Sequence, residues 1–182
     1  MEQEFLKNRF IEDQRFGPFG SIANRANFIA ARIQMAFVDH STEDFLGGRK
    51  GGYLCVAEGD SGNPHFTVLV GGHVNQKKLP RYYHLSHEKA VRLSQNPTHV
   101  SSFQSRDGEN KFGGAVRTLN GLIYSFSGFP ELVDEALVLS LMRLGAKFKD
   151  KDSIETIKNH CDSIAGLSKN PFYPVLARWC DL

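Results

Sequence analysis

The histidines are the residues whose type and spacing point most directly to chemistry. His84 and His87 are three residues apart, so on a helix their imidazoles share one face. His73 ends an expected strand shortly before them. Two helical imidazoles and a third from a strand could bind Zn²⁺ or haem iron. The alternative is that all three are ordinary surface histidines, because no HExxH motif and no nearby cysteine accompanies them.

Two basic residues are candidates for binding an anionic ligand. Lys89 lies in YYHLSHEKAVR, a mixture of tyrosines and cations that could hold ligand carboxylates or an RNA backbone. The same pattern is also typical of a solvated helix face. Arg117 lies in the middle of an expected strand. If its side chain lines a cleft, its guanidinium could hold a carboxylate through two parallel hydrogen bonds.

The corner Ser127-Gly128 joins an expected strand directly to an expected helix. Unpaired N–H groups at the helix N-terminus, together with the Ser127 hydroxyl, could bind an anion. In the alternative interpretation, Ser127 caps the helix and Gly128 adopts a positive φ in the turn. Pro130 removes one N–H and Glu131 adds a negative charge, so capping is favoured.

Other glycine and cysteine motifs favour structural roles. The segment GGRKGG at 47–52 lacks the GxxxxGK[ST] pattern of a phosphate loop, so we interpret it as an ordinary loop. Cys55 lies on an expected buried strand and is interpreted as a small hydrophobic residue. Ser127 lacks the GxSxG context of a catalytic serine. The sequence therefore leaves open whether the protein is an enzyme.

The elements that position these residues alternate between helices and hairpins. Apolar residues recur at helical spacing in 21–38 and 130–144. Helical character also begins near Tyr83 and stops at Asn96-Pro97, and a weaker helix is expected at 152–165. Between them, β-branched runs joined by turn residues predict two β-hairpins. This order predicts the α+β class, with an antiparallel sheet of two hairpins covered by helices.

The expected organisation has three parts. They are an N-terminal arm at 1–20 with a turn at Gly17-Pro18, an α+β domain at 21–149 and a C-terminal helical extension at 150–182. The run from Pro130 to about Leu144 is apolar over much of its circumference, so we expect this helix to be sandwiched inside the core.

Composition excludes several classes of protein. The chain has 182 residues, 41% hydrophobic and 23% charged, which is ordinary for one globular domain. A net charge of +2 argues against a dedicated nucleic-acid binder, and no apolar run is long enough for a membrane span. The N-terminus shows no signal peptide, and three widely spaced cysteines suit a reducing compartment. We therefore expect a cytoplasmic protein without nucleic-acid or membrane partners.

Four short motifs follow one another in the central part of the chain. They are Lys89-Ala90 on a helix, Gly113-Gly114 on a strand, Ser127-Gly128 at the corner and Asp134-Glu135 on the next helix. With the order of elements, they resemble the GlcG/HbpS-like family, also described as haem-degrading or PduO C-terminal-like domains. The resemblance covers roughly residues 21–145. It implies a profilin-like α-β-α sandwich that binds haem or a related tetrapyrrole.

Three functions follow as hypotheses. The first is binding of a small ligand, with haem as the favoured cofactor. The second is a structural or dimerisation module, in which the protein is a homo-oligomer and aromatic residues near both ends contact a partner. The third is an enzyme centred on the histidine face. The aromatic residues of the second hypothesis are Phe10, Phe16, Phe19, Phe172, Tyr173 and Trp179.

Overall fold

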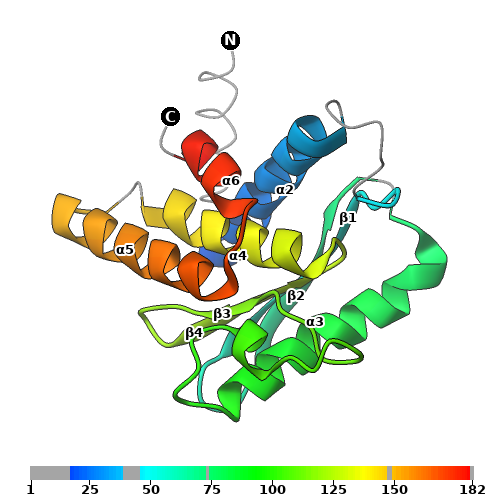
Figure 1. Cartoon of the computed structure of the whole chain (residues 1–182), viewed down its shortest axis with the longest axis horizontal. Helices are drawn as coiled ribbons and strands as arrows, with labels where there is room; N and C mark the ends of the chain where they lie inside the picture. The colour runs from blue at the N-terminus through cyan, green and yellow to red at the C-terminus, as the bar shows by residue number, and fades with distance from the viewer. Residues whose placement is uncertain (1–16, 39–45, 73, 147–148, 181–182) are drawn as a thin grey trace.

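The computed structural model describes residues 17–38, 46–72, 74–146 and 149–180. Within these residues, four strands form one antiparallel sheet in the order β2-β1-β4-β3. The helices and short 3₁₀ turns complete the chain (Figure 1). The elements are α2 (Gly17–Val38), β1 (Gly51–Glu58), β2 (Pro64–Gly71), η2 (Gln76–Lys78), α3 (Leu79–Ser94), η3 (Ser102–Ser105), β3 (Ala115–Arg117), β4 (Leu122–Ser127), α4 (Glu131–Ala146), α5 (Lys151–Ser168) and α6 (Tyr173–Cys180).

The elements are arranged in layers around the sheet. Helix α3 packs on one face, against β1 and β4, while α2 and α4 pack on the other face. Helices α5 and α6 pack against α4 (Figure 1), and α5 also reaches the edge strand β3, where His160 Nε2 lies 2.9 Å from the Arg117 carbonyl oxygen. The predicted α+β class, with hairpins covered by helices and a helical C-terminal part, is confirmed.

Helix α2 buries the apolar stripe that the sequence predicts. Ile22, Ala26 and Ile29 are almost fully buried at spacings of three to four residues. The helix begins at Gly17, so the predicted turn at Gly17-Pro18 is wrong. Proline is tolerated in the first helical turn because the N–H that it lacks has no partner within the helix there.

Helix α4 is apolar nearly all round because it touches other elements on all sides. Val133, Ala136, Leu137, Val138 and Leu139 are all fully buried. Its sequence prediction as a sandwiched core helix is therefore confirmed.

The C-terminal helices share the core of the rest of the chain. Cys161 and Ile164 of α5 and Tyr173 and Leu176 of α6 belong to the same buried cluster as α2, α4 and the sheet. The side chain of Asp150 caps α5 by accepting a hydrogen bond from the Ser153 N–H at 2.9 Å. The extension therefore packs into the same core as the rest of the chain.

Candidate functional site

Lys89 and Asp134 form a buried ion pair between the two helical layers. Lys89, on α3, is only 1% exposed, and its Nζ donates to Asp134 Oδ2 at 2.9 Å on α4. The same Nζ donates to the Phe126 carbonyl of β4 at 2.8 Å. A Cβ on Gly114 would lie 2.9 Å from Nζ and 2.7 Å from the Asp134 Cβ. Gly114 therefore leaves the space in which the lysine crosses the sheet.

This pair belongs to the protein interior and offers little to an external ligand. Burial raises the pKa of the Asp134 carboxyl to about 6, although the Lys89 charge and its hydrogen bonds act in the opposite direction. Asp134 Oδ1 also accepts the Phe129 N–H at 2.8 Å, just before α4 begins. Three of the four motifs of the family resemblance therefore meet here, at Lys89, Gly114 and Asp134.

The predicted cap of α4 by Ser127 is wrong. Ser127 still belongs to β4, where it pairs with Tyr53 of β1, and its hydroxyl makes no hydrogen bond to the described N-terminus of α4. The Asp134 carboxylate holds the Phe129 N–H instead. The physical reason is distance along the chain, because three residues separate Ser127 from the first residue of α4.

The predicted positive φ at Gly128 is also wrong, and the glycine is required for a different reason. Gly128 is not among the described residues with positive φ. A Cβ there would lie 2.3 Å from the Gly51 carbonyl oxygen and 2.6 Å from the Gly52 Cα. Gly51 and Gly52, which the sequence assigned to a loop, begin strand β1. The two backbones therefore approach so closely that neither segment has room for a side chain.

Arg117 holds the fold together through backbone carbonyls. Its Nη1 donates to Gly59 O at 2.8 Å and its Nη2 to Leu93 O at 2.7 Å. Its Nε donates to His99 O at 3.3 Å. The guanidinium thus joins the end of α3 to the β1–β2 turn. The N–H groups of Arg117 that were expected to hold a ligand carboxylate are therefore already bonded to the protein's own carbonyls.

Glu135 is a second buried carboxylate, and its structural role was not predicted from the sequence. Glu135 is fully buried on α4 and accepts hydrogen bonds from Ser101 Oγ at 2.6 Å, from Ser168 Oγ, and from Asn170 Nδ2 at 3.2 Å. These donors come from the start of η3 and the end of α5. The signal in the sequence is a carboxylate within an otherwise apolar helix.

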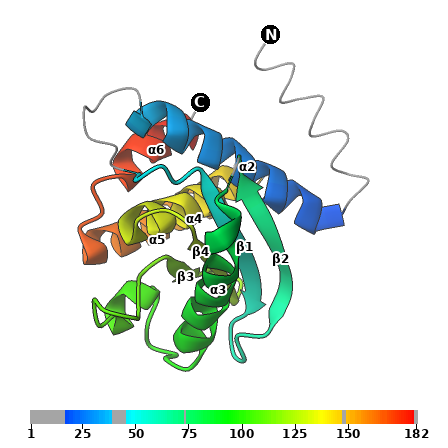
Figure 2. The same ribbon diagram turned by 90° about the vertical axis from the view of Figure 1, so that its right-hand side faces the viewer.

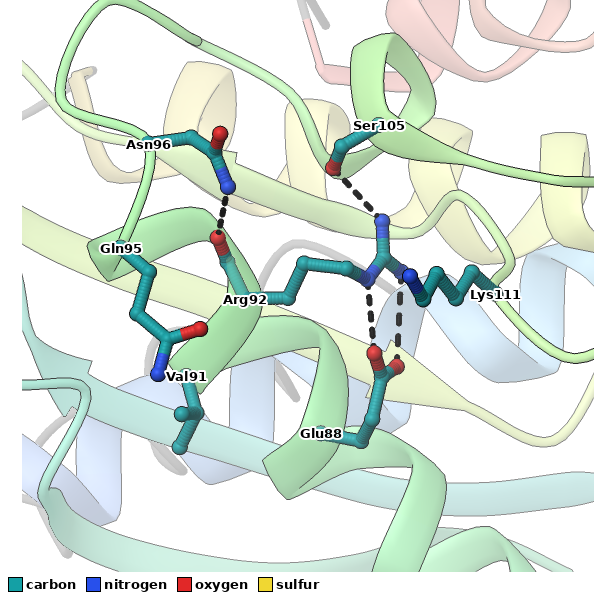
Figure 3. A pocket seen from close by; sticks show the side chains of 7 residues that line it. All are labelled: Glu88, Val91, Arg92, Gln95, Asn96, Ser105 and Lys111. Carbon is teal, nitrogen blue, oxygen red and sulfur yellow. Dashed lines mark hydrogen bonds and ion pairs between the residues drawn. The ribbon is translucent and has the colours of Figure 1, made fainter.

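Arg92 lines an open hollow of about 420 Å³ beside the C-terminal half of α3 (Figure 3). Glu88, Asn96, Ser105 and Lys111 also line it. The Arg92 guanidinium donates to Glu88 Oε1 at 2.7 Å, Ser105 Oγ at 2.7 Å and the carbonyls of Ser102 and Phe112. Since these groups occupy its donors, the Arg92 guanidinium serves the fold, while the side chains of Gln95 and Lys111 complete the lining of the hollow.

A row of side chains crosses three strands beside the N-terminal half of α3. Tyr53 of β1 lies directly opposite Leu69 of β2 on one side and Ser127 of β4 on the other. Alternation along strands places these three side chains on the α3 face of the sheet. Because α3 packs over β1 and β4, the β2 end of this row stays open, and Leu69 is 42% exposed.

Helix α3 lines this row with aromatic rings and an imidazole. The Tyr83 ring is edge-to-face with Tyr53 at 5.3 Å and with His87 at 4.2 Å between ring centres. Tyr83 is 47% exposed. His87 Nε2 lies 2.7 Å from Thr67 Oγ1 on β2. We call this set the aromatic face; its members are Tyr53, Thr67, Leu69, Tyr83, His84, His87 and Ser127.

The environment of His87 favours its neutral form. Burial lowers the pKa of the imidazole below its usual 6.5, and the neighbouring His84 lowers it further. Around His87, no carboxylate among the described residues hydrogen-bonds to the ring.

The interpretation of Cys55 as a buried hydrophobic residue is confirmed. Cys55 lies opposite Thr67 on β2, and burial raises the pKa of its thiol to about 11.

The seven predicted ligand residues thus separate into groups. His87 and Ser127 contribute to the aromatic face, with His84 beside His87 on α3, whereas Lys89, Arg117 and Gly128 serve the interior. His73 lies outside the described residues. In the described part of the chain, no three His, Cys, Asp or Glu side chains form a group that could hold a metal ion.

Comparisons with known proteins do not assign the chain to a family. No family model matches it, and no curated protein or solved structure is significantly similar to it. The GlcG/HbpS-like resemblance therefore stays a prediction. No helix among the described residues has the length and apolar character required to cross a membrane.

Proposed function

We propose that this protein binds a small, planar, conjugated molecule on the aromatic face, and that haem or a related tetrapyrrole is the first candidate. The observation that carries the proposal is the chain of edge-to-face rings from Tyr53 through Tyr83 to His87, half open to solvent beside the exposed Leu69. Large apolar and aromatic groups next to a few polar ones are typical of ligand sites.

The chemistry of the face suits such a ligand. The exposed Tyr83 ring can stack on a conjugated plane, and an aromatic pair typically contributes ~0.5–1.5 kcal/mol beyond the area that it buries. A neutral imidazole can ligate haem iron through a ring nitrogen, and the lowered pKa of His87 keeps it neutral at physiological pH. His84 is exposed one helical turn away, so it is the second candidate for an axial ligand.

Titration of the purified protein with haemin tests this proposal. We expect a Soret shift that saturates at micromolar haemin, and at least a tenfold weaker affinity in the double variant His84→Ala, His87→Ala. Met35→Ala is the control, because Met35 is an exposed thioether on α2 that could also attract haemin. A featureless titration of the wild-type protein, or equal losses in both variants, would remove the proposal.

The alternative hypothesis of an aromatic docking surface near both ends has less support. Phe172 packs edge-to-face on Phe37 at 5.3 Å, and Tyr173 is buried in the core. Trp179 is 38% exposed, with the Arg32 guanidinium 4.6 Å from its ring. Phe10 and Phe16 lie outside the described residues. Aromatic residues near the C-terminus therefore serve mainly the protein's own packing.

A further inference from the structure

Strand β2 is the open edge of the sheet, and its hydrogen-bonding directions follow from two contacts at its end. The Gly72 N–H donates toward β1, to Lys50 O at 3.1 Å. The preceding Gly71 N–H points the other way and donates to Asn27 Oδ1 at 2.8 Å. Because these directions alternate along a strand, the N–H and C=O groups of Thr67 and Leu69 point away from β1.

These outward groups define a short pairing surface. Asn27 covers the Gly71 end of the edge, and a register shift opposite Val56 and Ala57 interrupts the regular ladder at the other end. In the described part of the chain, β2 pairs only with β1, and Figure 2 shows it at the margin of the sheet. The exposed run of β2 carries no Lys, Arg, Asp or Glu, which are the residues that usually protect an edge strand.

We infer that β2 pairs antiparallel with β2 of a second copy of this chain, about a two-fold axis at Val68. Thr67 of each copy then lies opposite Leu69 of the partner subunit, and each such pair exchanges two hydrogen bonds. Val68 faces its own counterpart across the axis. An interface of this kind is closed and self-complementary, as two-fold dimers require.

Charge complementarity selects a second copy in the antiparallel orientation. Exposed Glu58 and Asp60 flank the start of β2, whereas exposed Lys77 and Lys78 follow its end. Antiparallel pairing places the acidic turn of each copy beside the basic segment of the other. Parallel pairing would place like charges together, which opposes association.

The pairing also extends the aromatic face. Since α3 lies over β1 and β4, its axis is about two strand spacings, or ~10 Å, from the two-fold axis. Two α3 helices of ~10 Å diameter would therefore border a groove ~10 Å wide, with Thr67 and Leu69 of both copies as its floor. This consequence rests on the proposed ligand function, but the pairing itself does not depend on it.

Sedimentation equilibrium of the full chain tests the pairing. We expect a monomer–dimer equilibrium that Leu69→Lys weakens at least tenfold, while Leu119→Lys leaves it unchanged. Leu119 is the matched control because it is also exposed and lies in the β3–β4 turn, away from the β2 edge of the sheet. A strict monomer at several hundred micromolar protein, or a dimer insensitive to Leu69→Lys, would overturn the inference.

A charge-exchange experiment tests the orientation. Asp60→Lys, and separately the double variant Lys77→Glu, Lys78→Glu, should each weaken self-association about tenfold at low salt. An equimolar mixture of the two should recover dimers. One end of the mixed dimer keeps the native acidic turn beside Lys77 and Lys78, and the other end places the lysine introduced at position 60 beside the two introduced glutamates. Failure of the mixture to recover would exclude this antiparallel arrangement.

Haemin titration separates the two proposals. If the groove is shared, Asp60→Lys should weaken haemin binding together with dimerisation, although Asp60 lies outside the aromatic face. A dimer that binds no haemin would contradict the proposed function and leave the pairing intact. Unchanged haemin binding by a monomeric Asp60→Lys variant would show that each copy carries a complete site and would overturn the shared groove.

Discussion

Lys89 Nζ lies 2.9 Å from Asp134 Oδ2, and this contact joins helices on opposite faces of the sheet. The lysine reaches its partner beside Gly114, whose missing side chain leaves room for it. A charge removed from water at this depth is tolerated only with a partner and further hydrogen bonds, and here the Phe126 carbonyl and the Phe129 N–H supply them.

The first prediction concerns this ion pair. Asp134→Leu should destabilise the protein by about 3–5 kcal/mol, because it leaves the Lys89 ammonium buried without its counter-charge. The double variant Lys89→Met, Asp134→Leu should be more stable than Asp134→Leu alone, since it removes both charges. Urea unfolding measures both effects. Equal or greater destabilisation in the double variant would show that Lys89 does not depend on Asp134.

The second prediction is the pH dependence of the same carboxyl group. Burial raises the pKa of Asp134 to about 6 in the folded protein, above its ordinary 3.8. The folded state therefore binds the proton more tightly, and this contribution to stability is present below about pH 3.8 and is lost as pH rises through 6. The stability of the wild type relative to Asp134→Asn should accordingly fall between pH 4 and pH 7.

The measurement is urea unfolding of both proteins across that pH range. Because groups away from this contact titrate equally in the two proteins, the difference between their unfolding free energies isolates the Lys89–Asp134 pair. A difference that grows with pH would mean that Lys89 lowers the Asp134 pKa by more than burial raises it.

The third prediction concerns the contact between β1 and the corner that follows β4. Gly52→Ala should cost at least ~1–3 kcal/mol, because its Cβ would lie 1.9 Å from the Ser127 carbonyl oxygen and force the strands apart. Gly128→Val should be at least as costly for the same reason. Gly166→Ala is the matched control, since a Cβ there meets no atom within 4 Å on α5. It should leave stability unchanged or raise it by ~0.5–1 kcal/mol.

The fourth prediction concerns the titration of His87. Its pKa, followed by NMR, should lie below the usual 6.5 because the ring is partly buried and has His84 beside it. In His84→Ala the pKa of His87 should rise, because a neighbouring positive charge is removed at low pH. Thr67→Val serves as a second variant, which removes the hydroxyl 2.7 Å from Nε2. If the pKa of His87 is unchanged in His84→Ala, the two imidazoles do not interact electrostatically.

Local patterns predicted much of the framework. The apolar stripe of α2 and the buried circumference of α4 follow from residue spacing alone, and the turn residues locate both hairpins. Errors occurred where a local rule had two outcomes. Gly17-Pro18 opens a helix because proline suits a first turn as well as a break, and Gly51-Gly52 begins a strand because two backbones meet there.

The candidate site was only partly predictable. The spacing of His84 and His87 placed them on one helix face, and His87 does lie beside the edge strand β2, close to Thr67. Tyr53, Leu69 and Thr67 were missed as members of the same surface, because their proximity to α3 depends on strand register. The roles of Lys89 and Arg117 could not be read from the sequence, since an exposed and an interior cation have the same local pattern.

The sequence by itself determined most of the helices and strands, although not where α2 and β1 begin, because helical and strand periodicities are properties of neighbouring residues. Only the tertiary structure decided which polar groups face water and which face each other. Lys89 meets Asp134 across 45 residues, and Arg117 bonds to carbonyls from three separate segments. These contacts depend on burial and on the pairing of distant chain segments. A charge removed from water is costly unless it has a specific partner, and no local pattern in the sequence names that partner.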